Sequence, residues 1–231
     1  MILSLSGKSF FSAAVFLAVT APFGAFAQRV VPLVDIQAVA PTIVVELRYA
    51  TPRNITGRAL YPPGTRALIR PEVARRLAVA ESYLRQHERG LKIWDAYRPE
   101  AAQLELWKAS PKNDYVADPG TTNGSLHRWG LAVDATLVDS KNRPVKMPTD
   151  FDDFTPAAMW PYRGTDQEVA TNLHLLQAAM NLGGFYGLRS EWWHFISQDW
   201  KQFVPDPDDD FNVHRKPAKP VKAKAIKKRK K

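Results

Sequence analysis

The sequence predicts a single α+β domain in which helices flank a central, mostly antiparallel sheet. Segments with helical and strand patterning alternate, but without the regular strand–helix–strand rhythm of a parallel sheet. No internal repeat is present. The 187 residues between an apolar N-terminal segment and a basic C-terminal segment are a suitable length for one hydrophobic core. These observations favour one enclosed domain over a repeat array or several domains.

Residues 1–27 are expected to form a secretory signal peptide. Lys8 precedes an apolar run, and the segment ends with Ala25-Phe26-Ala27, a small-residue cleavage pattern. The mature chain would then begin at Gln28 and be exported to the periplasm or the cell exterior. The alternative is a retained membrane anchor, but the apolar run is shorter than the ~20 residues that a spanning helix needs.

Residues 215–231 are expected to form a disordered basic tail, because they contain ten Lys and Arg, no acid and little apolar surface. With this tail and Lys8 set aside, the formal net charge falls from +9 to −2 for residues 28–214. The tail either has no fixed partner or contacts an anionic wall polymer or membrane surface loosely. Nucleic acid is not expected as a partner of an exported protein.

In chain order, the first element expected is a strand over residues 43–49, where apolar and polar residues alternate. Pro71 is typical of a helix start, and that helix should end near Gly90. Residues 91–97 then predict a strand with Ile93 and Asp95 on one face.

Pro99 begins a second predicted helix that continues through Trp107 and is followed by a turn-rich loop over residues 111–124. Residues 130–138 alternate as a strand would. Residues 191–196 are rich in aromatic and β-branched side chains, which also favours a strand.

A third helix is indicated between these last two strands. Thr165 and Glu168 have the spacing of a capping box, apolar residues follow at helical intervals, and Gly183-Gly184 should end the helix.

Two distant segments contain the groups of a hydrolytic zinc site. Catalytic zinc takes three ligands from His, Asp or Glu and leaves one position for water. His127, Asp134 and His194 make such a set, and the chain has no cysteine to compete with them. Glu191 is left over as a base that could take a proton from water. No Gly-rich phosphate loop is present, so nucleotide chemistry has no support.

The spacing of these residues makes demands on the local geometry. His127 and Asp134 can meet only if the chain turns near Gly130, where glycine permits it. Glu191 and His194 are three apart, which places them on opposite faces of a regular strand. Glu191 should therefore precede the strand, or the strand should be irregular. Arg98, at the end of the strand over residues 91–97, is a candidate donor to an oxyanion.

The pattern Ser125-x-His127-x-x-Gly130-x-Ala132-x-Asp134, followed by Glu191-x-x-His194, resembles the signature of the zinc D-alanyl-D-alanine dipeptidases and their relatives, the D,D-carboxypeptidases. Segments 47–51, 94–99 and 147–154 resemble the dipeptidase branch. The resemblance covers nearly all of residues 30–212, and it implies a zinc D,D-peptidase-like fold.

The resemblance also implies a role for eight residues. His127, Asp134 and His194 would bind one zinc ion. Glu191 would be the general base, and Arg98 would stabilise the transition state. The substrate would be bound by Ser125, Tyr49 and Asp152. Asp150 and Asp153 stand close enough to Asp152 to be alternatives for its role.

The function implied is zinc-dependent hydrolysis of D-Ala-D-Ala. Two alternatives remain open at this point. The chain could be a D,D- or L,D-carboxypeptidase that trims peptidoglycan stem peptides, or a non-catalytic zinc-containing module that binds cell wall. Glu191 together with Arg98 favours an enzyme, because a binding module needs no base.

Overall fold

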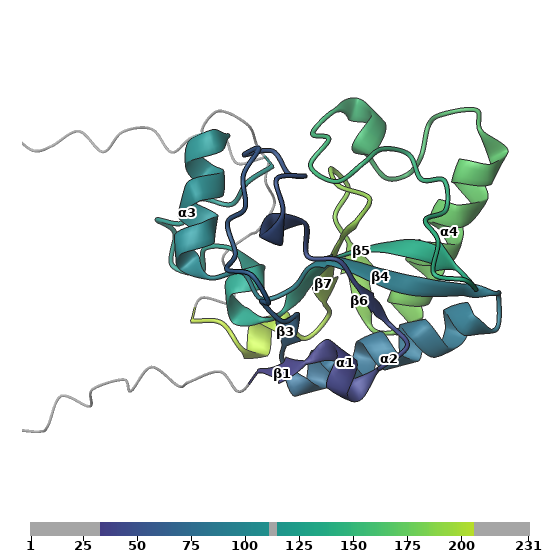
Figure 1. Cartoon of the computed structure of the whole chain (residues 1–231), viewed down its shortest axis with the longest axis horizontal. Coiled ribbons are helices and arrows are strands. Elements are labelled where there is room, and N and C mark those ends of the chain that lie inside the picture. Colours follow the sequence, from purple (N-terminus) through teal and green to yellow (C-terminus); the bar gives the residue numbers. More distant parts are fainter. Residues whose placement is uncertain (1–32, 111–114, 206–231) are drawn as a thin grey trace, which may run out of the picture. The chain divides into compact units, whose positions relative to one another are not determined.

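The computed structural model describes residues 33–110 and 115–205 (Figure 1). The predicted signal peptide over residues 1–27 and the predicted basic tail over residues 215–231 lie outside these ranges, so both stay predictions. Within the described ranges, no helix is long and apolar enough to cross a membrane.

A five-stranded sheet forms the centre of the domain, in the order β2-β4-β5-β7-β6. β2 pairs in parallel with β4, and the other three pairings are antiparallel. The predicted mostly antiparallel sheet is therefore confirmed. The strands are β2 (Val44–Val45), β4 (Arg89–Asp95), β5 (Ala132–Asp139), β7 (His194–Ser197) and β6 (Phe185–Gly187). A smaller sheet, which the sequence did not indicate, pairs β1 (Val34–Asp35) with β3 (Leu68–Ile69).

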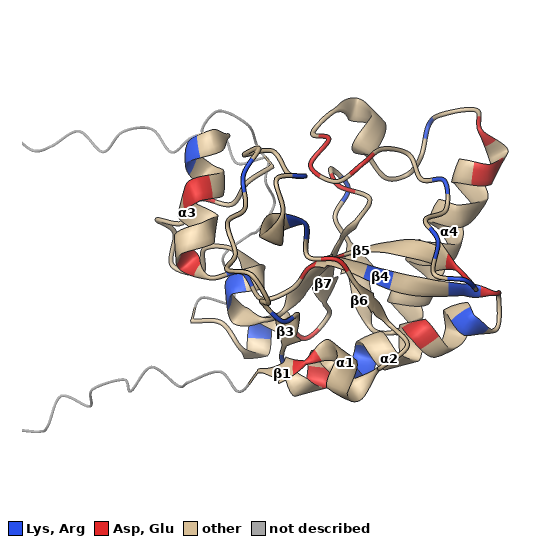
Figure 2. Ribbon diagram, viewed as in Figure 1, with Lys and Arg blue, Asp and Glu red and all other residues tan. Residues whose placement is uncertain are grey.

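Helices flank the sheet, as predicted. The helices α2 (Pro71–Arg85) and α4 (Gln167–Leu182) pack against each other and against the strands, whereas α3 (Glu100–Ala109) lies away from both (Figure 1). The short α1 (Ile36–Val39) contacts α2. Charged residues occur on β4 as well as on the helices (Figure 2). Lys92, Asp95 and Asp134 of the sheet are buried, and the last two stand in the site described below.

Helix α2 begins where the sequence predicts but ends earlier than predicted. Pro71 occupies the first turn of α2, where its missing N–H costs nothing. The helix ends at Arg85, earlier than the predicted Gly90, because Glu88 adopts a left-handed conformation (φ 55°) that turns the chain into β4. α3 begins directly after Pro99 and extends two residues beyond the predicted end at Trp107.

Two further local predictions were wrong. Within residues 43–49 only Val44–Val45 form a strand, and a 3-10 turn, Arg48–Ala50, follows because the Ala50 and Thr51 amides bond back to the preceding turn. The N-cap of α4 is Asp166 and not Thr165: the Asp166 carboxylate accepts hydrogen bonds from the Glu168 and Val169 amides. Asp166 therefore makes the capping hydrogen bonds expected of Thr165, and Asp ranks at or above Thr as an N-cap residue.

Candidate functional site

The predicted turn at Gly130 is present. A 3-10 helix, Leu126–Trp129, carries His127, and the Ser125 hydroxyl caps it by accepting a bond from the His127 amide. Gly130 then adopts a left-handed conformation (φ 64°) and leads into β5 with Asp134. A Cβ at Gly130 would lie 2.8 Å from the end of the Leu33 side chain and 3.2 Å from the Arg70 backbone nitrogen, so it would crowd this turn, and the left-handed backbone itself favours glycine.

The second segment takes the arrangement in which Glu191 precedes its strand. β7 begins at His194, which lies opposite Asp134 in the ladder between β5 and β7. Glu191 is in the turn before β7, and the His194 amide donates to its carbonyl oxygen at 3.2 Å. The alternation of a strand therefore does not apply to this pair, and Glu191 and His194 line the same cavity.

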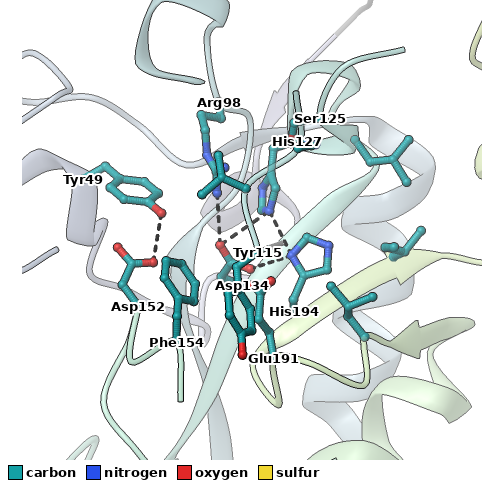
Figure 3. A pocket seen from close by; sticks show the side chains of 15 residues that line it. Tyr49, Arg98, Tyr115, Ser125, His127, Asp134, Asp152, Phe154, Glu191 and His194 are labelled. Atoms are coloured by element: carbon teal, nitrogen blue, oxygen red, sulfur yellow. Dashed lines mark hydrogen bonds and ion pairs between the residues drawn. The ribbon is translucent and has the colours of Figure 1, made fainter. Parts of the chain in front are cut away.

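The three candidate metal ligands converge at the spacing of a tetrahedral site (Figure 3). His127 Nε2 lies 3.3 Å from His194 Nδ1 and 3.4 Å from an Asp134 oxygen, and His194 Nδ1 lies 2.9 Å from the other Asp134 oxygen. Donors bound tetrahedrally at about 2.0–2.1 Å from zinc are about 3.3 Å apart. The side chains thus fit a zinc ion with a fourth position open.

The orientation of His127 supports metal binding. Its Nδ1 is 2.7 Å from the Ala96 carbonyl oxygen, which can only accept a hydrogen bond, so Nδ1 carries the proton. Nε2 is then unprotonated, and its lone pair can coordinate a metal ion. Burial alone would raise the pKa of Asp134, but the neighbouring His127 and His194 side chains outweigh it and hold that pKa well below its ordinary value. Asp134 is therefore ionised and can coordinate a metal ion.

Glu191 is buried in the same cavity without belonging to the ligand set. Burial raises its pKa well above the ordinary value, and the neighbouring Asp134 and Asp152 carboxylates raise it further. A carboxylate whose pKa is raised holds a proton more readily and is a better proton acceptor.

Arg98 is fixed by three side chains. Its Nε donates to Asp95 at 2.8 Å, one terminal nitrogen donates to Gln103 Oε1 at 2.9 Å, and the other lies 3.4 Å from Asp134. Asp95 also accepts a 2.6 Å bond from the Tyr61 hydroxyl. Sequence reasoning missed these supports: Asp95 stands in the segment that carried the resemblance, but nothing in the sequence pointed to Tyr61 or Gln103.

Asp152 and Tyr49 meet on another side of the cavity (Figure 3). The Tyr49 hydroxyl donates to one Asp152 oxygen at 3.1 Å, and the Ile55 amide donates to the other at 3.0 Å. Burial raises the pKa of Asp152 to about 6. Asp150 instead forms an ion pair with Arg48 at 2.9 Å, and of residues 150, 152 and 153 only Asp152 lines the cavity within the described chain.

All eight residues singled out in the sequence line this one cavity. Part of the remaining wall is apolar, and no sequence signal had identified it. Tyr115 and Phe154 stack there, with their ring centroids 4.9 Å apart and their planes at 14°. The other apolar wall residues are Val116, Ala117, Leu126, Leu188 and Ile196. The cavity thus combines one metal-ligand set, a buried carboxylate beside it, a guanidinium and a second carboxylate.

Comparison with known proteins gives matches over most of the chain. The model of the D-Ala-D-Ala dipeptidase family matches residues 29–214. The D-alanyl-D-alanine dipeptidase of Escherichia coli (strain K12) is 39% identical over 163 residues, which cover 71% of this chain and 83% of that protein. The D-alanyl-D-alanine dipeptidase of Enterococcus faecalis (strain ATCC 700802 / V583) is 28% identical and covers 72% of this chain and 90% of its own length.

A solved structure of the D,D-pentapeptidase VanY, from a VanB-type vancomycin resistance cassette, is also similar. It covers 61% of this chain and 79% of its own at 18% identity, with a TM-score of 0.37.

Proposed function

The chain belongs to the D-Ala-D-Ala dipeptidase family, and we propose that it hydrolyses the D-Ala-D-Ala dipeptide with a zinc ion bound by His127, Asp134 and His194. The observation that carries this proposal is the tetrahedral spacing of the three donor side chains beside a buried carboxylate that is not a ligand. A zinc ion bound there supplies a Lewis acid that lowers the pKa of water and polarises the scissile carbonyl.

The chain's own residues then divide the remaining work. Glu191 takes a proton from the attacking water and returns it to the leaving amine, and its raised pKa suits both transfers. Arg98 donates hydrogen bonds to the carbonyl oxygen as that oxygen gains negative charge. Arg98 needs no movement to do so, because Asp95 and Gln103 already hold its guanidinium.

Asp152 and Tyr49 account for a preference for dipeptides. We propose that the ionised Asp152 pairs with the free ammonium group of the substrate, while Tyr49 orients the Asp152 carboxylate through its hydroxyl. Any peptide extension would replace that ammonium by an amide and leave a buried charge unpaired, which is costly. Ser125, at another point of the cavity wall, offers a further hydrogen-bonding group to the dipeptide.

Two substrates test this proposal. The zinc-loaded protein should hydrolyse D-Ala-D-Ala and leave intact a longer stem peptide that ends in D-Ala-D-Ala. Equal cleavage of both would identify a carboxypeptidase instead. Zinc binding with no hydrolysis of either peptide would favour the wall-binding module.

For the residues outside the described ranges, we propose that residues 1–27 direct export and are removed, and that residues 215–231 contact an anionic wall polymer or membrane surface. Their compositions support this proposal. Cell fractionation with N-terminal sequencing should find a chain that begins at Gln28 outside the cytoplasm. Sedimentation with anionic vesicles or wall polymer should depend on the tail and weaken with salt. A cytoplasmic, full-length chain would contradict export.

A further inference from the structure

Gln103 joins two parts of the cavity that the proposed mechanism treats separately. It lies on α3 and its side chain is nearly fully buried (2% exposed). Its Oε1 accepts a hydrogen bond from Arg98 at 2.9 Å, and its Nε2 donates to the Ala117 carbonyl oxygen at 2.6 Å. Both ends of one amide are therefore used, one on the guanidinium and one on the cavity wall.

On the Arg98 side, Gln103 completes the support of the guanidinium. Asp95 holds the Nε edge at 2.8 Å, and Gln103 holds a terminal nitrogen. Two supports on different nitrogens of a planar group determine its position and its plane. The neutrality of Gln103 matters as well, because Asp95 and Asp134 already face Arg98. A third carboxylate would compete with a developing oxyanion for the positive charge of Arg98.

On the wall side, Gln103 fastens the segment of residues 115–117. Tyr115, Val116 and Ala117 all line the cavity, and Tyr115 stacks on Phe154. Backbone carbonyls of loop segments that form no ladder need a partner when they are shielded from water. The Gln103 amide supplies that partner to Ala117 from a helix, which is a rigid support.

We propose that Gln103 is a positioning residue that holds Arg98 in a fixed position relative to the wall segment 115–117. A dipeptide that packs against this wall then finds the guanidinium already placed at its scissile carbonyl. The inference rests on the proposed function, since it assigns Gln103 to the same hydrolytic reaction. Gln103 does not contact the reacting atoms in this scheme; it acts through Arg98.

The test replaces Gln103 by Met, which has a similar length and volume but makes neither hydrogen bond. Gln103→Met should lower kcat for D-Ala-D-Ala roughly ten- to a hundredfold, because misplaced catalytic groups cost up to about a hundredfold. Zinc content should stay at one per chain. Gln37→Met is a control for the loss of a glutamine hydrogen bond: this exposed glutamine also donates to a backbone carbonyl, that of Ile43, and does not line the cavity, so kcat should not change.

A double-mutant cycle with Arg98→Ala separates positioning from a general structural role. If Gln103 acts through Arg98, Gln103→Met should have little further effect on kcat in the Arg98→Ala background. The same fold loss in both backgrounds, or an unchanged kcat in Gln103→Met alone, would overturn the proposal while leaving the hydrolytic function intact. If the wild-type protein hydrolyses no dipeptide, the proposed function is wrong and this inference is wrong with it.

Discussion

Glu191, which is buried, and Asp152, which is half-buried, share one cavity, and desolvation there is the main cause of the raised pKa of each. Their immediate partners differ. Asp152 accepts hydrogen bonds from the Tyr49 hydroxyl and the Ile55 amide, which stabilise its ionised form. Glu191 stands beside the candidate zinc ligands. In the proposed mechanism these environments separate their roles, one as a proton carrier and the other as a fixed negative charge.

Replacing Glu191 by Gln should lower kcat by a factor of roughly 10²–10⁴, because the amide cannot accept a proton from water. Glu191 is not a member of the ligand set, so zinc content should stay near one per chain. Steady-state kinetics and metal analysis of the same preparation measure both. A fully active Glu191→Gln variant would rule out the general base proposed here.

Asp152 should produce an acid limb in the pH profile. Its pKa is raised from 3.8 to about 6 by burial, and only its ionised form pairs with the substrate ammonium. A bound zinc cation moves that pKa downward, so kcat/KM should rise with pH through a midpoint at or below about pH 6. Asp152→Asn should raise KM and remove this limb. A limb that persists unchanged in Asp152→Asn would assign it to another group.

The same shift affects folding of the metal-free protein with a definite sign. Because the pKa of Asp152 is higher in the folded chain than in the unfolded chain, the unfolded carboxyl ionises first as pH rises. The contribution of Asp152 to stability is therefore present below about pH 4 and is lost as pH rises to about 6.

At the scale of elements, the ends of helices and strands position the site more than their middles do. The 3-10 helix Leu126–Trp129 ends at Gly130, which sends the chain into β5, and β7 starts only at His194. Helix α4 has its own start signal in Asp166. These termini can be tested one at a time.

Gly130→Ala should reduce both stability and zinc affinity. The residue has a left-handed backbone and almost no room for a Cβ, so the substitution should cost about 1 kcal/mol or more. The strain lies between His127 and Asp134, and its relief would move one ligand relative to the other. Urea unfolding of the metal-free protein and zinc titration measure the two effects. Wild-type values in both would contradict this account of the turn.

Asp166→Ala should lower Tm by roughly 2–4 °C, the usual effect of losing a helix N-cap in a domain of this size. Thr165→Ala is the paired variant and should leave Tm unchanged, since Asp166 provides the cap. Neither substitution should change kcat, because neither residue lines the cavity. A larger loss of Tm in Thr165→Ala than in Asp166→Ala would restore the capping box expected from the sequence.

At the scale of the whole molecule, the sheet brings together chemical groups that are far apart in the chain. The strands β4, β5 and β7 are adjacent in the sheet. Asp95 ends β4 and is followed closely by Arg98, Asp134 lies in β5, and His194 begins β7. Their pairing sets Asp134 opposite both Asp95 and His194. A register shift in β4 between Ile93 and Asp95 creates the first of these pairs and interrupts the simple alternation expected for that strand.

Because the proposed zinc ion joins β5, β7 and the preceding 3-10 helix, its removal should destabilise the fold. Ligand binding to the native state adds about 2.7 kcal/mol at a free concentration one hundred times Kd. Chelation should therefore lower Tm and abolish hydrolysis, and added zinc should restore both. His194→Ala should show no zinc-dependent change in Tm. An identical Tm with and without zinc would show that zinc binding does not stabilise the fold.

Much of the fold could be predicted from local patterns. Pro71, Pro99 and Gly183 mark helix ends correctly, and apolar alternation over residues 130–138 identifies β5. Such signals succeed because they depend on residues close in the chain. The smaller sheet and β6 were not predicted, because strands of two or three residues contain too few positions to show an alternating pattern.

By itself, the sequence determined which residue types are available for the site: two histidines and two carboxylates at characteristic spacings, with no cysteine. Only the tertiary structure decided that Asp152 lines the cavity while Asp150 pairs with Arg48, that Glu191 lies before β7, and that Gln103 connects Arg98 to the wall. The physical reason is that burial and partners arise from strand pairing across tens of residues. Spacing along the chain carries no record of those contacts.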